Sequence, residues 1–251
     1  LDTPILKIIS GHKVANLDAR KKRITIQDLL TMRAGLEWHE DLPYADPKNS
    51  ADLMEASHDW TQYAIDQPMA QEPGKTFVYS SGDAELLAQV FKKVTGKEID
   101  SYAEEHLFKP LGMQYFWKHS PDGLPDTEGG LYLSSADLAK IGQLYLKGGM
   151  WQGKEIVSSY WIKQSMAPNI AVPGGDWKYG YLWWLQSFGS TPQDVAWTAR
   201  GFGGQQLLVV PAYDMVAVFT GWDILPSTEK HQHDQLPRLL DAANRFYGCV
   251  E

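Results

Sequence analysis

The sequence predicts an α+β fold, in which an antiparallel sheet accompanies a largely helical region. Apolar residues recur at helical spacing through the first two thirds of the 251 residues, and the last third contains apolar runs typical of strands. Helices followed by strands along one chain are typical of α+β proteins. Because no repeat, low-complexity tract or linker divides the chain, we expect a single domain over residues 1–251. A mainly helical region should span about 15–130, and a helix with the antiparallel sheet about 131–251.

Three helix starts are marked by a Ser or Thr followed three positions later by Asp, the pattern of a capping box. The pairs are Thr25 with Asp28, Ser80 with Asp83, and Ser134 with Asp137. We expect a helix within residues 24–36 that ends with Gly35 in the left-handed C′ position. The second and third helices should end at Gly96 and at Gly148-Gly149.

Other elements follow from periodicity and from breaking residues. The apolar run at residues 179–185 predicts one buried strand, and residues 205–210 and 215–220, joined by a turn at 211–214, predict an antiparallel hairpin. Further helices are expected at residues 50–66, about 100–107 with a break at Pro110, 159–166, and about 235–246. The polar, aromatic residues 38–49 should form a surface loop, and loops of that length are often functional.

Composition excludes several classes of protein. The net charge is −8 and the longest basic run covers only residues 20–23, which argues against nucleic acid as a partner. Cys249 is the sole cysteine, so neither an intrachain disulfide nor a cysteine metal site can form. No apolar run reaches the length of a membrane-spanning segment.

Common catalytic and cofactor motifs are absent. The sequence contains neither a Gly-x-Ser-x-Gly elbow nor a Walker A motif. Gly201-Phe202-Gly203-Gly204 begins like a dinucleotide loop, but a strand follows it instead of a helix. His231-Gln232-His233 has no third ligand nearby and is better explained as a solvated loop. We therefore predict no cofactor and no metal.

Tyr79 stands directly before the helix that Ser80 caps. The partial positive charge of a helix N-terminus favours an anion, so a tyrosine held there could serve as a general base. A packing role is the simpler interpretation of the local pattern alone. Similarly, Trp183 and Trp184 could line a binding cleft, although such residues more often belong to the core and its rim.

Several stretches occur in an order and spacing typical of one known superfamily. They are residues 24–36 (ITIQDLLTMRAGL), Pro73-Gly74 before Tyr79-Ser80-Ser81, Val94-Thr95-Gly96, residues 110–113 (PLGM), residues 129–139 (GGLYLSSADLA), and residues 199–205 (ARGFGGQ) before a strand ending in Val210-Pro211. Together they span nearly the whole chain. The chain resembles the serine β-lactamase and penicillin-binding protein superfamily, in particular the class C-like serine hydrolases that include esterases and nylon-oligomer hydrolases.

The resemblance implies a β-lactamase/transpeptidase-like fold and acyl transfer through a serine. A neighbouring group must take the serine proton, and backbone N–H groups must stabilise the oxyanion of the tetrahedral intermediate. By resemblance, Tyr79 is the base and Ser81 is the third residue of the Tyr-x-Ser element. Gly201-Phe202-Gly203 matches the strand that faces the substrate, with the Phe202 N–H as oxyanion donor.

The resemblance also implies the kind of substrate. Class C β-lactamases carry Asn where this chain has Ser81, and the usual Lys-Thr-Gly or His-x-Gly triplet is missing. Both differences favour the esterase and amide-hydrolase branches over antibiotic hydrolysis. We expect a small ester, amide or peptide substrate, in a pocket shaped by residues 38–49 and Trp183.

The family nucleophile, in a Ser-x-x-Lys motif, lies upstream of the segment that Leu1-Asp2-Thr3-Pro4 resembles. We therefore expect it outside this chain and expect the fold to be N-terminally incomplete. Ser227 and Lys230 match the motif by coincidence, in a polar loop after the last strand. An upstream segment or an oligomer should cover the sheet edge that the missing strands leave. The resemblance slightly favours a periplasmic or extracellular location, which the sequence itself leaves open.

Three functional hypotheses remain. The first is a class C-like serine hydrolase that forms an acyl-serine intermediate. The second is a non-catalytic ligand-binding or scaffold protein of the same fold, because the nucleophile is missing and fold does not fix function. The third, a metal-dependent hydrolase using His231 and His233, has the least support.

Overall fold

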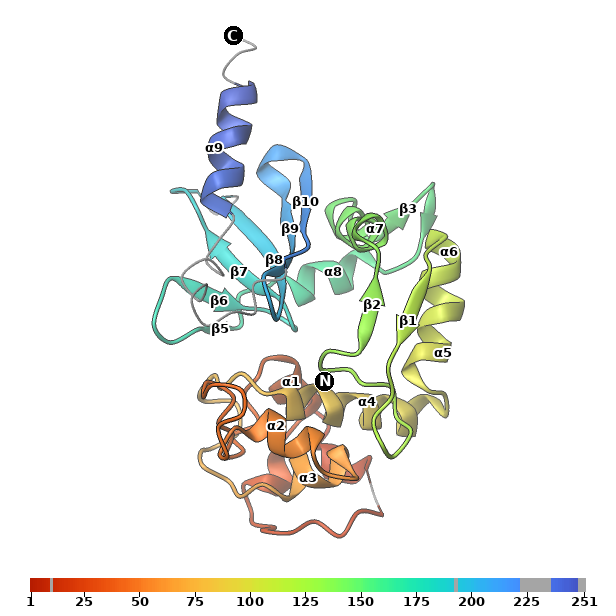
Figure 1. Ribbon diagram of the computed structural model, residues 1–251, viewed down its shortest axis with the longest axis vertical. Helices are drawn as coiled ribbons and strands as arrows, with labels where there is room; N and C mark the ends of the chain where they lie inside the picture. Colours follow the sequence, from red (N-terminus) through yellow and green to blue (C-terminus); the bar gives the residue numbers. More distant parts are fainter. Residues whose placement is uncertain (10, 192–193, 222–235, 248–251) are drawn as a thin grey trace. The chain divides into compact units, whose positions relative to one another are not determined.

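The computed structural model describes residues 1–9, 11–191, 194–221 and 236–247 (Figure 1). The chain divides into two compact units, Leu1–Tyr132 and Leu133–Glu251, each with its own apolar core. The first unit is mainly helical and the second contains the large antiparallel sheet, as the α+β prediction requires. That the two regions form one domain stays a prediction.

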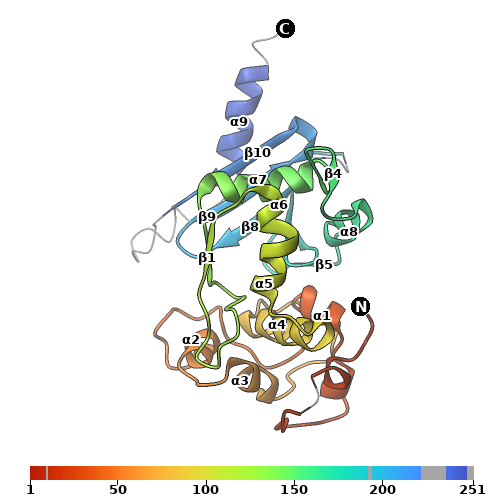
Figure 2. The same cartoon turned by 90° about the vertical axis from the view of Figure 1, so that its right-hand side faces the viewer.

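The first unit contains short helices around one long helix. Its elements are η1 (Ile5–Lys7), η2 (Lys21–Arg23), α1 (Ile26–Leu30), α2 (Ser50–Glu55), α3 (Trp60–Asp66), α4 (Ser81–Thr95), α5 (Ile99–Ala103), η3 (Glu104–Phe108), α6 (Lys109–Leu111), and the two-stranded sheet of β1 (Tyr115–Trp117) and β2 (Leu131–Leu133). Helices α1 and α3 pack against α4 (Figure 2). Leu86 and Val90 of α4 enter a core with Leu29, Met54 and Ile65. Each fully buried side chain of this kind contributes about 1.5–3 kcal/mol.

The predicted start of α4 is confirmed. The Ser80 hydroxyl accepts the Asp83 N–H at 3.1 Å, and Gly96 at φ 71° ends the helix. Only half of the capping box forms, because the Asp83 carboxyl accepts the Ala34 N–H instead of turning back to Ser80. The box of Thr25 and Asp28 is complete, and Ser134 caps α7 through the Asp137 N–H at 3.0 Å.

The prediction of a helix over residues 24–36 is wrong at its C-terminal end. Helix α1 ends at Leu30, and Met32 already has a left-handed φ of 55°. Gly35 has a φ of 78°, yet it serves a different purpose from a helix cap. Its carbonyl accepts the N–H groups of Ala70 and Gln71, and a Cβ at this position would lie 2.7 Å from the Gln71 oxygen. Packing of residues 32–35 against residues 70–71 therefore overrides the local helical pattern.

Helical structure also continues further than predicted around Pro110. It starts at Ile99, changes to a π-helical turn over Glu104–Phe108, and ends after Leu111 with Gly112 at φ 60°. Pro110 lies in the first turn of α6, a position where a missing N–H is tolerated. The helical structure therefore ends later than the predicted residue 107, and the break predicted for residues 110–113 occurs at Gly112.

The second unit is built on a six-stranded antiparallel sheet of order β10-β9-β8-β7-β6-β5. Its elements are α7 (Ser135–Leu146), β3 (Met150–Trp151), β4 (Lys154–Glu155), α8 (Ser159–Ser165), β5 (Ile170–Ala171), β6 (Trp177–Tyr179), β7 (Trp184–Ser187), β8 (Val195–Gly201), β9 (Gln205–Val210), η4 (Pro211–Tyr213), β10 (Met215–Phe219) and α9 (Leu236–Tyr247). The predicted hairpin at residues 205–220 is confirmed as β9 and β10, with Met215 opposite Val210.

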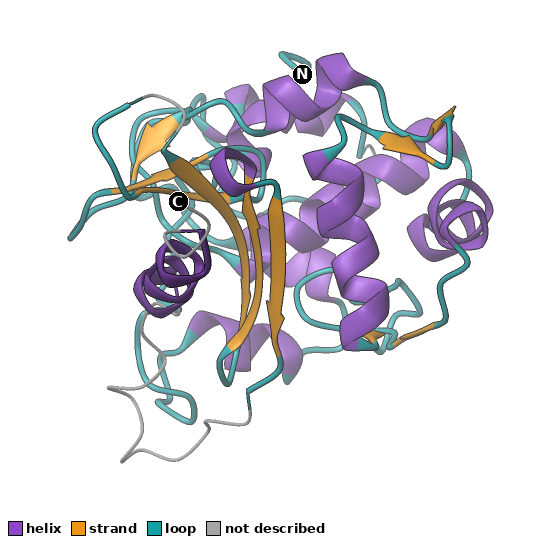
Figure 3. Cartoon of the chain, turned by 90° about the horizontal axis from the view of Figure 1, so that it is seen from above, coloured by secondary structure: helices purple, strands orange, loops and turns teal. Residues whose placement is uncertain are grey.

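Alternating side chains of β9 bury the two faces of this sheet. Leu207 and Val209 pack with residues of α7, whereas Leu208 and Val210 pack with residues of α9. Figure 3 shows the strands nearly edge on, with α9 beside one face. The strand period of two thus explains why β9 is apolar along almost its whole length.

The prediction of one strand over residues 179–185 is wrong. Strand β6 ends at Tyr179, the chain turns, and β7 starts at Trp184. The Gly180 N–H donates to the Trp183 carbonyl at 2.8 Å, and Leu182 has a left-handed φ of 60°. The unbroken aromatic run concealed a hairpin, because residues on both sides of the turn are buried.

Candidate active site

The N-terminus of α4 places Tyr79 and Ser81. Ser80 caps the helix, and the Val78 N–H donates to the Met32 carbonyl at 2.9 Å, so the backbone is fixed on both sides of Tyr79. The Tyr79 side chain is 37% exposed, whereas Ser81 is 5% exposed. A tyrosine that directly precedes a 15-residue helix stands where negative charge is favoured. Tyr79 is thus accessible and Ser81 is held inside.

Ser81 is bound at two points by one carboxylate, that of Glu40. The Ser81 N–H donates to Oε2 of Glu40 at 2.7 Å, and the Ser81 hydroxyl donates to Oε1 at 2.7 Å. The Trp38 indole N–H donates to the same Oε2 at 2.8 Å. A carboxylate at a helix N-terminus satisfies an unpaired N–H and complements the helix dipole. Residues 38–49 therefore reach the first turn of α4, as expected for a functional loop.

Two further carboxyl groups join this network. Ser81 and Glu55 both lie close enough to the Glu128 side chain to change its pKa. A serine hydroxyl has one proton to donate, and that of Ser81 is donated to Glu40 Oε1. The neighbouring Glu55 raises the pKa of Glu128, which favours the protonated form of Glu128. We call Glu40, Ser81, Glu55 and Glu128 the carboxyl network.

Burial raises the pKa of Glu128 to about 8; the nearby Ser81 hydroxyl lowers this pKa, while Glu55 and the charge of Asp126 raise it. A cation lies close by, since Lys118 Nζ is 3.2 Å from Asp126 Oδ2. Burial by itself would lower the pKa of Lys118, but Asp126, Glu55 and Glu128 together raise it. Lys118 therefore stays charged beside a carboxyl network that holds a proton at neutral pH.

Tyr44, in the same loop as Glu40, is a second phenol near these groups. Burial raises its pKa to about 12, and the charges of Glu40, Glu128 and Glu55 act in the same direction. A phenol with so high a pKa stays protonated at neutral pH and donates a hydrogen bond. Tyr44 is accordingly an unsuitable proton acceptor in the described environment.

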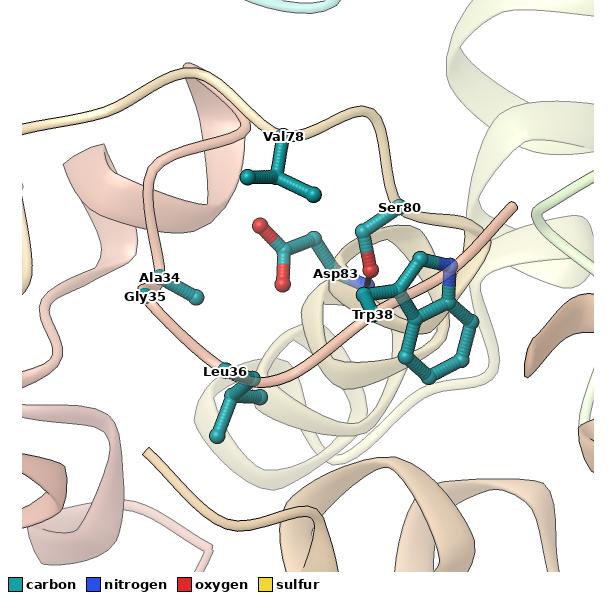
Figure 4. Close-up of a pocket in the computed structure, with 7 residues that line it drawn as sticks. All are labelled: Ala34, Gly35, Leu36, Trp38, Val78, Ser80 and Asp83. Atoms are coloured by element: carbon teal, nitrogen blue, oxygen red, sulfur yellow. Dashed lines mark hydrogen bonds between the residues drawn. The ribbon is translucent and has the colours of Figure 1, made fainter. Parts of the chain in front are cut away.

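Behind the capping turn lies a small cavity of about 10 Å³, lined by Ala34, Gly35, Leu36, Trp38, Val78, Ser80 and Asp83 (Figure 4). This is roughly the volume of one water molecule and is too small for a substrate. The Asp83 carboxyl lies between residues 34–35 and Val78. Burial raises its pKa well above the ordinary value, and the bond from the Ala34 N–H partly offsets this. The cavity is a small gap in the packing between residues 34–36 and the start of α4.

The other predicted site residues belong to the second unit. Gly201 is the last residue of β8, opposite Gln205 of β9, and Phe202 is 58% exposed in the connecting turn. Gly203 has a φ of 76°, which a glycine adopts without strain. Trp183 is 7% exposed and packs with Tyr145, at 4.6 Å between ring centroids. The structure thus groups Tyr79 with Ser81 in one unit and the remaining four residues in the other; their roles stay predictions.

Residues 1–221 match the sequence pattern of the β-lactamase family. The chain belongs to the β-lactamase family. The match confirms the resemblance to the serine β-lactamase and penicillin-binding protein superfamily, which rested on short motifs spread along the sequence.

Three named proteins illustrate what this chain is similar to within the family and its fold. The chain is 25% identical to a 6-aminohexanoate-dimer hydrolase of Paenarthrobacter ureafaciens over 250 residues, which cover 90% of this chain and 61% of that protein. The fold matches a candidate 6-aminohexanoate-dimer hydrolase from Bacillus anthracis with a TM-score of 0.79, at 23% identity, over 99% of this chain and 67% of that one. It also matches an octameric penicillin-binding protein homologue from Pyrococcus abyssi with a TM-score of 0.64, at 20% identity, over 96% and 60% of the two chains.

These likenesses confirm the β-lactamase/transpeptidase-like fold. The chain spans less than two thirds of the length of the curated relatives it matches. In the described part of the chain, no helix is long and apolar enough to cross a membrane. Within the same residues, no group of three or more His, Cys, Asp or Glu side chains is arranged to bind a metal. His231, His233, Ser227 and Lys230 lie outside the described residues.

Sequence reasoning missed the carboxyl network. Glu40 lies within the loop that was predicted to be functional, so an acidic residue there was an available signal. Glu55 ends α2, and Glu128 precedes the Gly-Gly motif at residues 129–130. No periodicity relates three carboxyl groups so far apart in sequence, and only the folded first unit brings them to Ser81.

Proposed function

We propose that the full-length protein is a class C-like serine hydrolase that cleaves an ester or amide bond through an acyl-serine intermediate. Tyr79 is the general base, and the nucleophilic serine comes from sequence outside residues 1–251. The single observation that carries the proposal is the Tyr79-Ser80-Ser81 element, accessible at Tyr79 and fixed at Ser81 on the N-terminus of α4. It occurs in a chain whose residues 1–221 match the β-lactamase family.

The reaction takes place in two acyl-transfer steps. The serine oxygen forms a bond to the substrate carbonyl carbon as its proton passes to the Tyr79 oxygen. The oxyanion is stabilised by backbone N–H groups, among them that of Phe202, before the alcohol or amine leaves with a proton. Water then attacks the acyl-serine, which releases the acid and restores the serine. Removal of the Tyr79 hydroxyl would abolish proton transfer in both steps.

An amide is the first substrate class to test. One relative is named a 6-aminohexanoate-dimer hydrolase, and a solved structure with a TM-score of 0.62 is named a D-stereospecific amidohydrolase from Streptomyces. Ser81, in place of the Asn of class C β-lactamases, gives antibiotic hydrolysis less support. We therefore favour linear amides, with small esters as the second class.

A fluorophosphonate probe tests the proposal, because it labels an activated serine with loss of fluoride. We expect intact-mass labelling of the full-length protein and none of residues 1–251 alone. Absence of labelling in both would favour the non-catalytic binding or scaffold protein of the same fold. Labelling of a protein that contains only residues 1–251 would place the nucleophile within these residues and refute the assignment.

The same proposal extends to the sheet edge and to location. Among the described strands, β10 is the edge of the six-stranded sheet, and its residues are all half-buried. An apolar edge strand pairs readily with another chain or segment. We propose that upstream strands or a second subunit cover β10.

Export to the periplasm or exterior is proposed by family resemblance, and fractionation of cells would test it.

A further inference from the structure

A buried carboxyl group on α4 lies one turn after Ser81. Glu85 is fully buried, and residues four apart lie on the same face of a helix. Its Oε1 accepts the Thr127 N–H at 2.7 Å, the Thr127 hydroxyl at 3.0 Å and the Glu128 N–H at 3.1 Å. Its Oε2 is buried without a hydrogen-bond partner in the described structure. Oε1 therefore makes every hydrogen bond from the Glu85 side chain to the turn at residues 127–128, and the Ala84 carbonyl is a second acceptor for the Thr127 hydroxyl, also at 3.0 Å.

This turn is attached to α4 at two successive positions. Glu85 holds its backbone, and the Glu128 side chain lies close enough to Ser81 for the serine to lower its pKa. The Glu128 backbone and side chain thus lie on one helix face. Without Glu85, two N–H groups of a half-buried turn would lose their acceptor, and a buried N–H without a partner is destabilising. The turn would then move to reach water, and Glu128 would move with it.

We propose that Glu85 is a positioning residue, which anchors the turn at residues 127–128 so that the Glu128 carboxyl stays against Ser81 in the base element. The proposal rests on the role assigned above to the Tyr79-Ser80-Ser81 element. Glu85 itself acts through Glu128 and has no contact with the reacting atoms.

The geometry says what Glu85 must supply. Since only Oε1 is used, a carbonyl oxygen suffices, and the glutamine amide has one at the same place. Burial raises the pKa of Glu85 to about 7, although the bonds from Thr127 oppose this. Near neutral pH the group is therefore often uncharged, which agrees with a role that requires an acceptor and no charge.

The test compares Glu85→Gln and Glu85→Leu in the full-length protein. Titration of the Glu128 carboxyl is followed by carbon-detected NMR, with the signal assigned from the Glu128→Gln spectrum. The groups that face Glu128 are Ser81, Glu55, Asp126 and Lys118, with Glu40 acting through Ser81. All of them remain in both variants, so a change in titration reports movement of the turn.

We expect Glu85→Gln to keep the Glu128 pKa near 8 and to keep wild-type turnover. Glu85→Leu should return the Glu128 pKa toward the ordinary range of a glutamate, because the turn moves into solvent. Its kcat should fall about 10-fold to 100-fold, as for a displaced positioning contact, with a smaller change in KM. Should Glu85→Leu fail to fold, Thr127→Val, which removes one of the three bonds, should shift the titration in the same direction.

Gln89→Leu provides a matched control. Gln89 lies one turn further along α4, is 8% exposed and bonds His12, away from the turn at residues 127–128. It should leave the Glu128 titration unchanged. The proposal would be overturned if the Glu128 pKa stayed unchanged in Glu85→Leu. It would also be overturned if the Glu128 pKa returned to the ordinary range in Glu85→Gln. A full-length protein that resists fluorophosphonate would refute the hydrolase, whereas the NMR comparison would still decide the role of Glu85.

Discussion

The N–H and the hydroxyl of Ser81 donate to the two oxygens of the Glu40 carboxylate, each at 2.7 Å. This paired contact joins residues 41 positions apart and closes the loop at 38–49 onto the first turn of α4. It holds Ser81 inside the first turn of α4, two residues after the exposed Tyr79. Its energetic contribution can be measured directly.

Glu40→Gln should lower the free energy of unfolding by about 1–3 kcal/mol, because a bond from Ser81 to a charged acceptor is lost. Urea denaturation, followed through a spectroscopic signal from the first unit, would measure this change. Glu37→Gln, directly before this loop, is the control. Among the described residues the Glu37 carboxylate pairs with the exposed His39, so its loss should stay within about 0.5 kcal/mol. Equal effects of the two variants would contradict the structural role of Glu40.

Tyr79→Phe should reduce kcat of the full-length enzyme by about 10² to 10⁴, the usual contribution of a general base. The fold should persist, since the ring is retained. Tyr102→Phe is a matched control, because Tyr102 is also 37% exposed and its ring contacts Phe91. Steady-state kinetics on a linear amide would compare them. Wild-type turnover in Tyr79→Phe would remove Tyr79 from the mechanism.

Stability should fall as the pH rises from about 5 to about 8. Glu128 has a folded-state pKa of about 8 against an ordinary value of 4.5, so the folded protein binds more protons over this range. The stabilisation is complete below 4.5 and is lost as the pH rises through 8. Thermal unfolding measured across this range should show the decline.

Glu128→Gln should make this decline shallower, because the amide cannot ionise, and Glu85, whose pKa burial raises to about 7, should cause the remainder. Glu105→Gln is the control, since Lys97 lowers the pKa of Glu105 and its removal cannot abolish a decline near pH 7. A decline of the same slope in Glu128→Gln would show that other groups cause it.

Gly35→Ala should destabilise the protein more than Gly96→Ala. Both glycines have left-handed φ values, of 78° and 71°, so each alanine carries a conformational cost of about 1 kcal/mol. Only at Gly35 would the new Cβ meet backbone, 2.7 Å from the Gln71 oxygen, whereas Gly96 has open space. Chemical denaturation of both variants would compare their free energies of unfolding. Equal decreases would mean that the backbone of residues 70–71 moves easily to make room for the new Cβ.

Residues 1–251 alone should associate in solution through the edge strand β10. Size-exclusion chromatography with light scattering should show species larger than a monomer, and the full-length protein should show fewer. The physical reason is the unpaired N–H and C=O groups of an edge strand. A stable, monodisperse monomer of residues 1–251 would argue against the proposal that another segment or a partner covers β10.

Local sequence determined those features whose causes lie within a few residues. Ser80 and Gly96 determine the ends of α4, because capping and left-handed φ preferences act over one helical turn. The β9–β10 hairpin was likewise predictable, since two apolar runs flank Pro211 and the left-handed Asp214. Tyr79 could be identified as the candidate base only because motifs along the chain together resembled a family.

Tertiary structure decided the features that depend on distant segments. Helix α1 ends early because Gly35 packs on Gln71, and the aromatic run after Tyr179 turns because both arms of the hairpin are buried. The carboxyl network joins α2, the loop at 38–49 and the turn at 127–128 to Ser81, and hydrogen bonds between segments so far apart leave no periodic trace in sequence. The sequence by itself thus determined the ends of α4, the β9–β10 hairpin and the family, and the folded first unit decided which carboxyl groups lie near Ser81.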